Sequence, residues 1–167
     1  MNRHNIFISL GSNEGDREGL LQQAIDSIRT YVGKVVRVSS TYEGDPVGFR
    51  SDKRFLNLCI ELKTDASPQQ LLLKLEAIEV KLGRLKPSIF SEYTDRTIDL
   101  DIIFFDDVVV NTKDLIIPHN KMHLRRFVLE PLAELCPDFI HPVFKKSVKV
   151  LLGECPDESK LTVTLRR

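Results

Sequence analysis

The chain has 167 residues, of which 42% are hydrophobic, a length and composition typical of one domain with its own core. Lysine plus arginine and aspartate plus glutamate number 24 each, so no overall charge favours nucleic acid or an anionic membrane surface. The apolar run before Gly11 is too short for a signal peptide or a spanning helix. We therefore expect a single cytoplasmic domain over residues 1–167.

The cysteines and histidines argue against transition-metal or redox chemistry. The three cysteines form no CxxC pair, and the four histidines show no HxxxH pattern on a predicted helix. We interpret the cysteines as small hydrophobic residues in a reducing compartment.

The first part of the chain alternates between the periods of strands and helices. Residues 6–10 alternate as a strand does, and the Gly11-Ser12-Asn13 segment then predicts a turn. Over residues 18–32, apolar side chains recur at three- and four-residue spacing, which predicts a helix with one buried face. Alternation over residues 36–42 predicts a second strand, followed by a long loop over residues 43–54.

The next elements have the clearest signals in the sequence. Alternation over residues 55–62 predicts a third strand with Leu56 to Leu62 inside. Ser67 is placed to cap a helix, with Pro68 at the first helical position and Gln70 completing a capping box. That helix is expected to end at Gly83, and a loop over 84–97 precedes a strand over 98–105.

The order of these elements is β-α-β-β-α-β, that of the ferredoxin-like split βαβ motif. We therefore predict an α+β protein in which both helices cover one face of an antiparallel sheet. The other face is open to bind a ligand unless the remaining chain covers it. Beyond the motif we expect C-terminal additions, namely a hairpin strand over 108–111, an extended piece over 115–117 and a helix over 127–135. The tail over 153–167 has no clear assignment.

Asp99 and Asp101 lie on one predicted strand and project to the same side. The alternating residues Ile98, Leu100, Ile102 and Phe104 must face the helices, so the two carboxylates face away together, with Cβ atoms about 6 to 7 Å apart. Two neighbouring aspartates are unfavourable in a strand, and a bound cation would compensate them. Magnesium uses one or two carboxylates together with substrate phosphates. The alternative from spacing alone is a solvated polar surface at the start of a strand.

Three other side chains suggest a ligand site, each with a simpler alternative. Phe55 and Asn57 should share the open face, where an aromatic ring beside an amide suits a flat heterocycle. The alternative is that they are ordinary surface side chains of a strand. Glu79 lies within about 50° of the centre of its helix's apolar stripe. Its carboxylate must find a partner, either a ligand hydroxyl or a nearby arginine.

Basic residues gather before and after the acidic strand. Each alone is typical of a solvated surface, but together with two carboxylates they suit a polyphosphate: Arg84, Lys86 and Arg96 before the strand, and His119, Lys121, Arg125 and Arg126 after Pro118. No GxxxxGK[ST] or GxGxxG loop is present, so these known backbone cradles for phosphate are not used.

Taken together, the sequence resembles the 6-hydroxymethyl-7,8-dihydropterin pyrophosphokinase family over about residues 6–142. The resemblance is carried in order by Gly11-Ser12-Asn13, Pro46-Val47-Gly48, Phe55-Leu56-Asn57, Arg96-Thr97-Ile98-Asp99-Leu100-Asp101-Ile102, Pro118-His119 and Met122-His123-Leu124-Arg125-Arg126-Phe127-Val128-Leu129. The segment around the two aspartates is the most specific of these.

The resemblance implies transfer of pyrophosphate from ATP to the hydroxymethyl group of a reduced pterin, with release of AMP, in folate synthesis. It implies two magnesium ions at Asp99 and Asp101, with Arg84 and Arg96 completing the catalytic set. It places ATP at Glu79, Ile102, Leu115, Ile116, His119 and Arg125. It places the pterin at Gly44, Pro46, Val47, Phe55, Asn57, Tyr93 and Phe127. We expect a monomer whose partners are ATP and the pterin, with no nucleic acid or membrane.

The sequence departs from the family pattern at three places. Family members commonly have threonine at the positions of Gly44 and Ile116, and an Arg-Trp-Gly-Pro-Arg-like run where this chain has Glu92-Tyr93-Thr94-Asp95-Arg96. The loop before the acidic strand is therefore less basic. Tyr93 can stack as the tryptophan would, but Glu92 cannot contact phosphate as a cation does.

Three competing functions remain to be distinguished. A non-catalytic ferredoxin-like ligand-binding module would also present an open sheet, but it would not need two aspartates beside an arginine-bearing loop. A single-stranded RNA-binding sheet would carry the K/R-G-F/Y-G/A-F-V-x-F/Y pattern, which is absent. A conventional kinase releasing ADP is the nearest enzymatic alternative, because residue spacing does not say which phosphorus is attacked.

Overall fold

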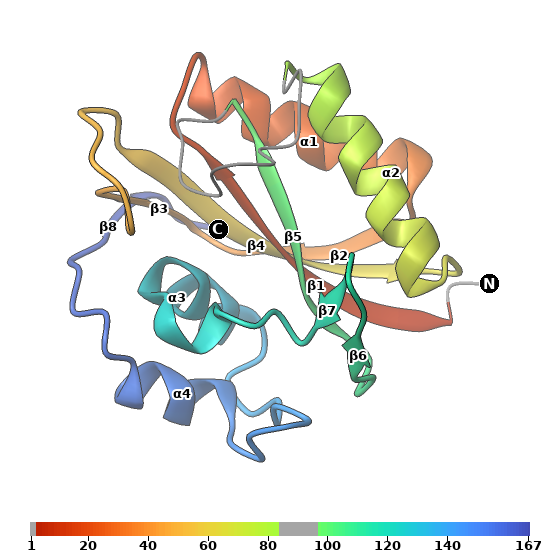
Figure 1. Ribbon diagram of the computed structural model, residues 1–167. Helices are drawn as coiled ribbons and strands as arrows, with labels where there is room; N and C mark the ends of the chain where they lie inside the picture. The colour runs from red at the N-terminus through yellow and green to blue at the C-terminus, as the bar shows by residue number, and fades with distance from the viewer. Residues whose placement is uncertain (1–2, 84–96) are drawn as a thin grey trace.

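A computed structural model describes residues 3–83 and 97–167, and its centre is an antiparallel sheet with helices on both faces (Figure 1). The strands follow the order β5-β1-β4-β3-β8, with β2 also paired to β4: β1 His4–Ser12, β2 Lys34–Val38, β3 Thr41–Gly44, β4 Phe55–Thr64, β5 Asp99–Phe105 and β8 Thr162–Leu165. Helices α1 Arg17–Tyr31 and α2 Pro68–Lys81 lie on one face. The α+β, ferredoxin-like prediction is confirmed.

The C-terminal additions lie mainly against the second face of the sheet. They comprise a two-stranded sheet of β6 Val110–Asn111 and β7 Ile116–Ile117, a short 3₁₀ helix Met122–Leu124, and helices α3 Arg126–Leu135 and α4 Val148–Glu154. Within the described residues, no helix is both long and apolar enough to cross a membrane.

The first core forms between the sheet and helices α1 and α2. On β1 and β4, alternate residues from Ile6 to Leu10 and from Leu56 to Leu62 are buried against the helices, as their periodicity predicted. Both helices begin after a residue whose side chain caps the helix N-terminus. Asp16 caps α1 by accepting from the Gly19 amide at 3.2 Å, and Ser67 forms the predicted capping box with Gln70.

The strand predicted over residues 36–42 is broken into β2 and β3, which pair with different parts of β4. At the break, the Cys59 amide donates to the Ser39 hydroxyl at 2.9 Å, and the Ser40 amide donates to a Glu134 carboxylate oxygen of α3 at 2.7 Å. Side-chain acceptors thus replace part of the regular strand ladder. This interruption depends on a residue 94 positions away in the sequence, so local alternation could not reveal it.

Two further strand predictions were wrong in detail. Gly11 does not end β1 but pairs with Asn57 on one side and Asp99 on the other, so the strand continues to Ser12. Phe104 does not face α1 and α2, because a register shift along β1 places Ile102 opposite Ile8 but Phe104 opposite Phe7. The irregularity resets the alternation and turns Phe104 to the second face.

The second face is partly covered by its own apolar core. Phe7, Cys59 and Phe104 from the sheet pack with residues of α3 and α4, including Leu132 and Leu151. Among residues 3–83 and 97–167, the prediction of a free face is therefore correct only for the end of the sheet where β1 finishes and β5 begins. This restriction places any ligand site at that end.

A buried histidine lies at the margin of the second core. His141 is 3% exposed, and its Nδ1 accepts hydrogen bonds from the amides of Val143 at 3.1 Å and Phe144 at 3.0 Å. Its ring stacks on Phe144 with centroids 4.2 Å apart and meets the edge of Phe104. Burial, followed by the charge of His123, lowers the pKa of His141 to about 4, and the accepting Nδ1 likewise requires a neutral ring.

We predict that His141 makes the fold acid-sensitive. Its unfolded pKa is about 6.5, so the stability that depends on its neutral form is complete above that pH and is lost as pH falls toward 4. The loss should reach roughly 3 kcal/mol of unfolding free energy. His141→Asn keeps an acceptor near the Nδ1 position but cannot titrate, so urea unfolding between pH 7 and pH 4.5 should show a flatter pH dependence. An unchanged slope would refute the assignment.

Candidate active site

A cleft opens at the end of the sheet that α3 does not cover, between the loop that follows β3 and the beginning of α3. It encloses about 520 Å³, with its open mouth included. Its lining comes from β1, β4, β5, the β3–β4 loop and α3 with its preceding residue: Ser9, Gly11, Asp45, Val47, Phe49, Phe55, Asn57, Asp99, Asp101, Arg125 and Phe127. Seven of these residues were predicted from the sequence: Val47, Phe55, Asn57, Asp99, Asp101, Arg125 and Phe127.

The floor of the cleft is set by strand register. Asn57 of β4, Gly11 of β1 and Asp99 of β5 lie opposite one another, and in the next row Ser9 lies opposite Asp101. Residues directly opposite in antiparallel strands point to the same face. The structure therefore brings Asn57 and both aspartates to one surface, with each carboxylate half-buried.

Gly11 allows the Asn57 side chain to lie close against the backbone of β1. A Cβ atom at this position would lie 2.6 Å from Oδ1 of Asn57 and 3.7 Å from Cδ1 of Phe55, and the first distance is too short for any real contact. The Asn57 amide thus lies over the bare backbone of β1. The Gly11-Ser12-Asn13 segment predicted a turn, whereas a glycine within a strand can also mark such a close approach.

Aromatic rings form the walls of the cleft. Phe55 meets Phe49 edge to face, with centroids 6.1 Å apart, and the Arg125 guanidinium carbon lies 5.7 Å from the centre of the Phe127 ring. Asn57 is only 4% exposed between these walls. Phe49 was not predicted, because it lies in a loop without periodicity.

The acidic residues of the cleft fit a magnesium site that the substrate completes. Among residues 3–83 and 97–167, no group of three or more histidine, cysteine, aspartate or glutamate residues is placed to hold a metal. Asp99 and Asp101 nevertheless both line the cleft. A pair of carboxylates suits magnesium, which keeps water and phosphate oxygens as its other ligands.

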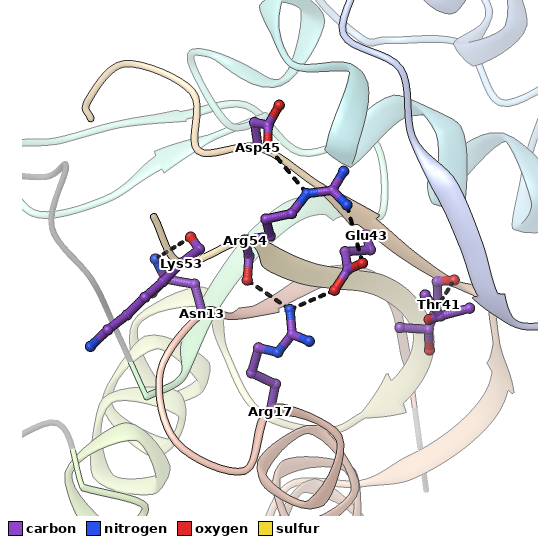
Figure 2. A network of polar contacts seen from close by, with 8 residues as sticks. Asn13, Arg17, Thr41, Glu43, Asp45, Lys53 and Arg54 are labelled. Atoms are coloured by element: carbon purple, nitrogen blue, oxygen red, sulfur yellow. Dashed lines mark hydrogen bonds and ion pairs between the residues drawn. The ribbon is translucent and has the colours of Figure 1, made fainter. Parts of the chain in front are cut away.

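An ion-pair network holds the base of the β3–β4 loop (Figure 2). Arg54 lies between the two acidic residues at the loop's start, with contacts of 3.3 Å to Glu43 and 3.1 Å to Asp45. Arg17 of α1 contacts the other Glu43 oxygen at 2.7 Å and donates to the Arg54 carbonyl at 2.9 Å. The network joins both ends of the loop that carries Val47 and Phe49. Its side chains were not predicted, since their charges also suit an exposed surface.

Several predicted ATP residues do not line this cleft. Glu79 is buried on α2 at 7% exposure, and Ile102 and Leu115 are buried in the first core. Ile116 and His119 line a separate groove beside β6 and β7. The His119 amide donates to the Ile103 carbonyl at 3.1 Å, which ties this groove to β5.

The remaining predicted residues fall in two groups. Gly44 is buried at the end of β3, and Pro46 is half-buried beside the cleft residues Asp45 and Val47. The predicted residues Arg84, Tyr93 and Arg96 lie outside the described residues, as does Glu92, where the sequence departs from the family pattern.

Comparison with known proteins gives one consistent family. The model of the 7,8-dihydro-6-hydroxymethylpterin-pyrophosphokinase family matches residues 7–137. A 2-amino-4-hydroxy-6-hydroxymethyldihydropteridine pyrophosphokinase of Bacillus subtilis is 44% identical over 131 residues, which cover 78% of this chain and 77% of the relative. One of the same description from Aquifex aeolicus is 35% identical over 144 residues, covering 86% and 88%.

Solved structures agree with the fold. A crystal structure of HPPK-DHPS in complex with substrates superimposes with a TM-score of 0.73 at 16% identity, over 91% of this chain and 43% of that chain. The wild-type Plasmodium falciparum HPPK-DHPS with pterin and p-hydroxybenzoate gives 0.72 at 17% identity, over 90% and 41%. This chain thus spans under half of each of these longer chains. By its family-model match and its close relatives, the chain belongs to the 7,8-dihydro-6-hydroxymethylpterin-pyrophosphokinase family.

Proposed function

We propose that this cleft transfers pyrophosphate from ATP to 6-hydroxymethyl-7,8-dihydropterin, giving the pterin diphosphate and AMP, in folate synthesis. The observation that carries the proposal is the shared surface of Asn57, Asp99 and Asp101, which joins a site for a heterocycle to a site for a metal-bound phosphate. Family membership supports the same reaction. We take residues 1–167 as one monomeric catalytic domain.

The pterin would occupy the aromatic part of the cleft. Phe55 and Phe127 offer ring faces and edges to a flat bicyclic ring, and the Asn57 amide offers both a donor and an acceptor. Gly44, Pro46 and Val47 would frame the edge of the pterin with backbone groups. Tyr93, which lies outside the described residues, completes this proposed set.

The triphosphate would occupy the charged part of the cleft. Asp99 and Asp101 would hold two magnesium ions, which when bound neutralise charge on the phosphate oxygens. Arg125 brings a cation to the same cleft, and we assign Arg84 and Arg96 to the phosphates as well. The nucleoside would extend along β5 toward His119 and the backbone of Ile102, Leu115 and Ile116, with Glu79 reaching a nucleotide hydroxyl.

In this reaction the hydroxymethyl oxygen attacks the β-phosphorus of ATP. A bond forms between that oxygen and the β-phosphorus, and the bond from the β-phosphorus to the oxygen of the α-phosphate breaks, so AMP leaves with that oxygen and the hydroxyl proton is released to solvent. The protein performs little covalent chemistry. Its contribution is to align the two substrates, to neutralise charge and to exclude water.

Product analysis tests the reaction directly. Protein, ATP, magnesium and the hydroxymethyl dihydropterin should yield AMP in amounts equal to the pterin diphosphate, measured by ion-exchange chromatography. Formation of ADP would indicate a conventional kinase, and no pterin-dependent turnover would reject the proposal.

Removing either carboxylate should abolish turnover without unfolding the protein. Asp99→Asn or Asp101→Asn should lower kcat at least about 100-fold, because the metal loses a charged ligand where transition-state charge develops. The melting temperature should stay close to wild type, since both groups line the cleft and not the core. Asp107→Asn, at an exposed position just after β5, is the matched control. A wild-type rate in either cleft variant would exclude the metal assignment.

Gly11 offers a test of the pterin end. Gly11→Ala places a methyl group against Oδ1 of Asn57, so the amide must shift and the KM for the pterin should rise by about tenfold or more. Gly153→Ala is the control, because a Cβ there meets no atom within 4 Å. Equal pterin KM values in the two variants would show that Asn57 does not contact the substrate.

A further inference from the structure

The chain ends in a segment that passes both walls of the cleft. After α4 ends at Glu154, residues 155–167, here called the C-terminal strap, run past α3 and finish as β8 beside β3 (Figure 1). The family match ends at residue 137, so the strap lies outside the matched part of the chain.

One end of the strap caps α3. This helix begins at Arg126 without a side-chain cap from the residue before it. Asp157 supplies the missing acceptor, because the Arg126 amide donates to Asp157 Oδ2 at 3.1 Å and Arg126 Nε donates to the Asp157 carbonyl at 2.8 Å. Arg125 and Phe127, on either side of Arg126, line the cleft.

The Asp157 carboxylate is held in its charged form. Burial alone would raise the pKa of Asp157, but hydrogen bonds from Ser159 and from the Arg126 amide lower it below the ordinary value. A negative charge at the beginning of α3 also interacts favourably with the helix dipole. This anchor is therefore maintained at neutral pH.

The other end of the strap is fixed to β3. β8 pairs with residues Thr41 to Glu43, and the Arg167 guanidinium donates to the Ser39 carbonyl and to the Thr41 hydroxyl, both at 2.9 Å. Leu161 packs directly on Gly44, where a Cβ atom would lie 2.5 Å from the leucine Cδ2. Gly44 is the last residue of β3, immediately before Asp45 of the cleft.

We propose that the C-terminal strap positions the pterin-binding walls, by tethering the beginning of α3 to the end of β3. Asp157 and Leu161 are only four residues apart, so the chain between them spans at most about 14 Å. The tether limits how far Phe127 and the Gly44–Val47 backbone can separate. This inference rests on the pterin-binding role proposed above, and the strap residues themselves act as positioning residues.

The test distinguishes the effect of each anchor on pterin binding from its effect on the stability of the fold. Leu161→Ala removes the packing on Gly44, Asp157→Ala removes the cap, and Glu158→Ala removes an exposed carboxylate from the same segment as the matched control. Asp157→Asn keeps an acceptor oxygen and serves as the conservative variant. The KM for the pterin, the KM for ATP and kcat are measured from AMP release, well below the melting temperature of each variant.

We expect Leu161→Ala to raise the pterin KM about fivefold and to change the ATP KM by less than twofold. Asp157→Ala should raise the pterin KM by a similar factor, with partial recovery in Asp157→Asn and wild-type values in Glu158→Ala. A lower melting temperature with unchanged pterin KM in both alanine variants would overturn the proposal, because the strap would then only stabilise the fold. Absence of AMP release by the wild-type protein would instead reject the proposed function.

Discussion

The pairing of β1 on both of its edges is the constraint on which the cleft depends. Since β4 and β5 flank it in fixed register, Asn57 and Asp99 must lie on either side of Gly11, and Asp101 must lie beside Ser9. A one-residue slip in either pairing would turn these side chains toward α1 and α2. The buried residues on the opposite side of the same strands, such as Ile8 and Leu58, make such a slip costly. The apolar core thus fixes the positions of the polar site.

The second core restricts where a ligand can bind. In a simple ferredoxin-like arrangement one whole face of the sheet is exposed, but here α3 covers it beyond the row of Ser9 and Cys59, and α4 packs on α3. The same helix α3 that closes the sheet carries Phe127 into the cleft, with Arg125 directly before it. The packing of α3 on the sheet therefore both covers the second face and forms one wall of the site.

Periodicity and capping residues predicted the elements that form from local information. The alternation of residues 56–62, the helix starting at Ser67 and the common orientation of Asp99 and Asp101 all follow from neighbours in the sequence. The predictions that were wrong involve residues whose structural partners lie far away in the sequence. Glu134 accepts from the Ser40 amide between β2 and β3, and an extra residue of β5, Ile103, interrupts its pairing with β1 and turns Phe104 around. The tail could not be assigned, because β8 is a strand only by pairing with β3.

In the candidate site, too, residues on regular elements could be predicted and residues on irregular segments could not. Residues on strands and on α3, such as Phe55, Asn57 and Phe127, could be placed by alternation and by the family resemblance. Phe49 and the Arg54 network depend on the path of an irregular loop, which no periodic pattern describes. Gly44 departs from the threonine common in the family, and the contact with Leu161 gives a steric reason for the smaller residue here. The roles of Arg84, Tyr93 and Arg96 remain predictions.

The position of β8 also affects how the molecule presents its sheet to other molecules. Without β8, the backbone amides and carbonyls of Thr41 to Glu43 would form an open strand edge, and such edges can pair with strands of other chains. β8 occupies that edge with only four residues, and the two arginines that follow it, Arg166 and Arg167, are both exposed. A short final strand followed by like charges is a poor template for further pairing. This arrangement thus discourages pairing of other chains with the β3 edge of the sheet.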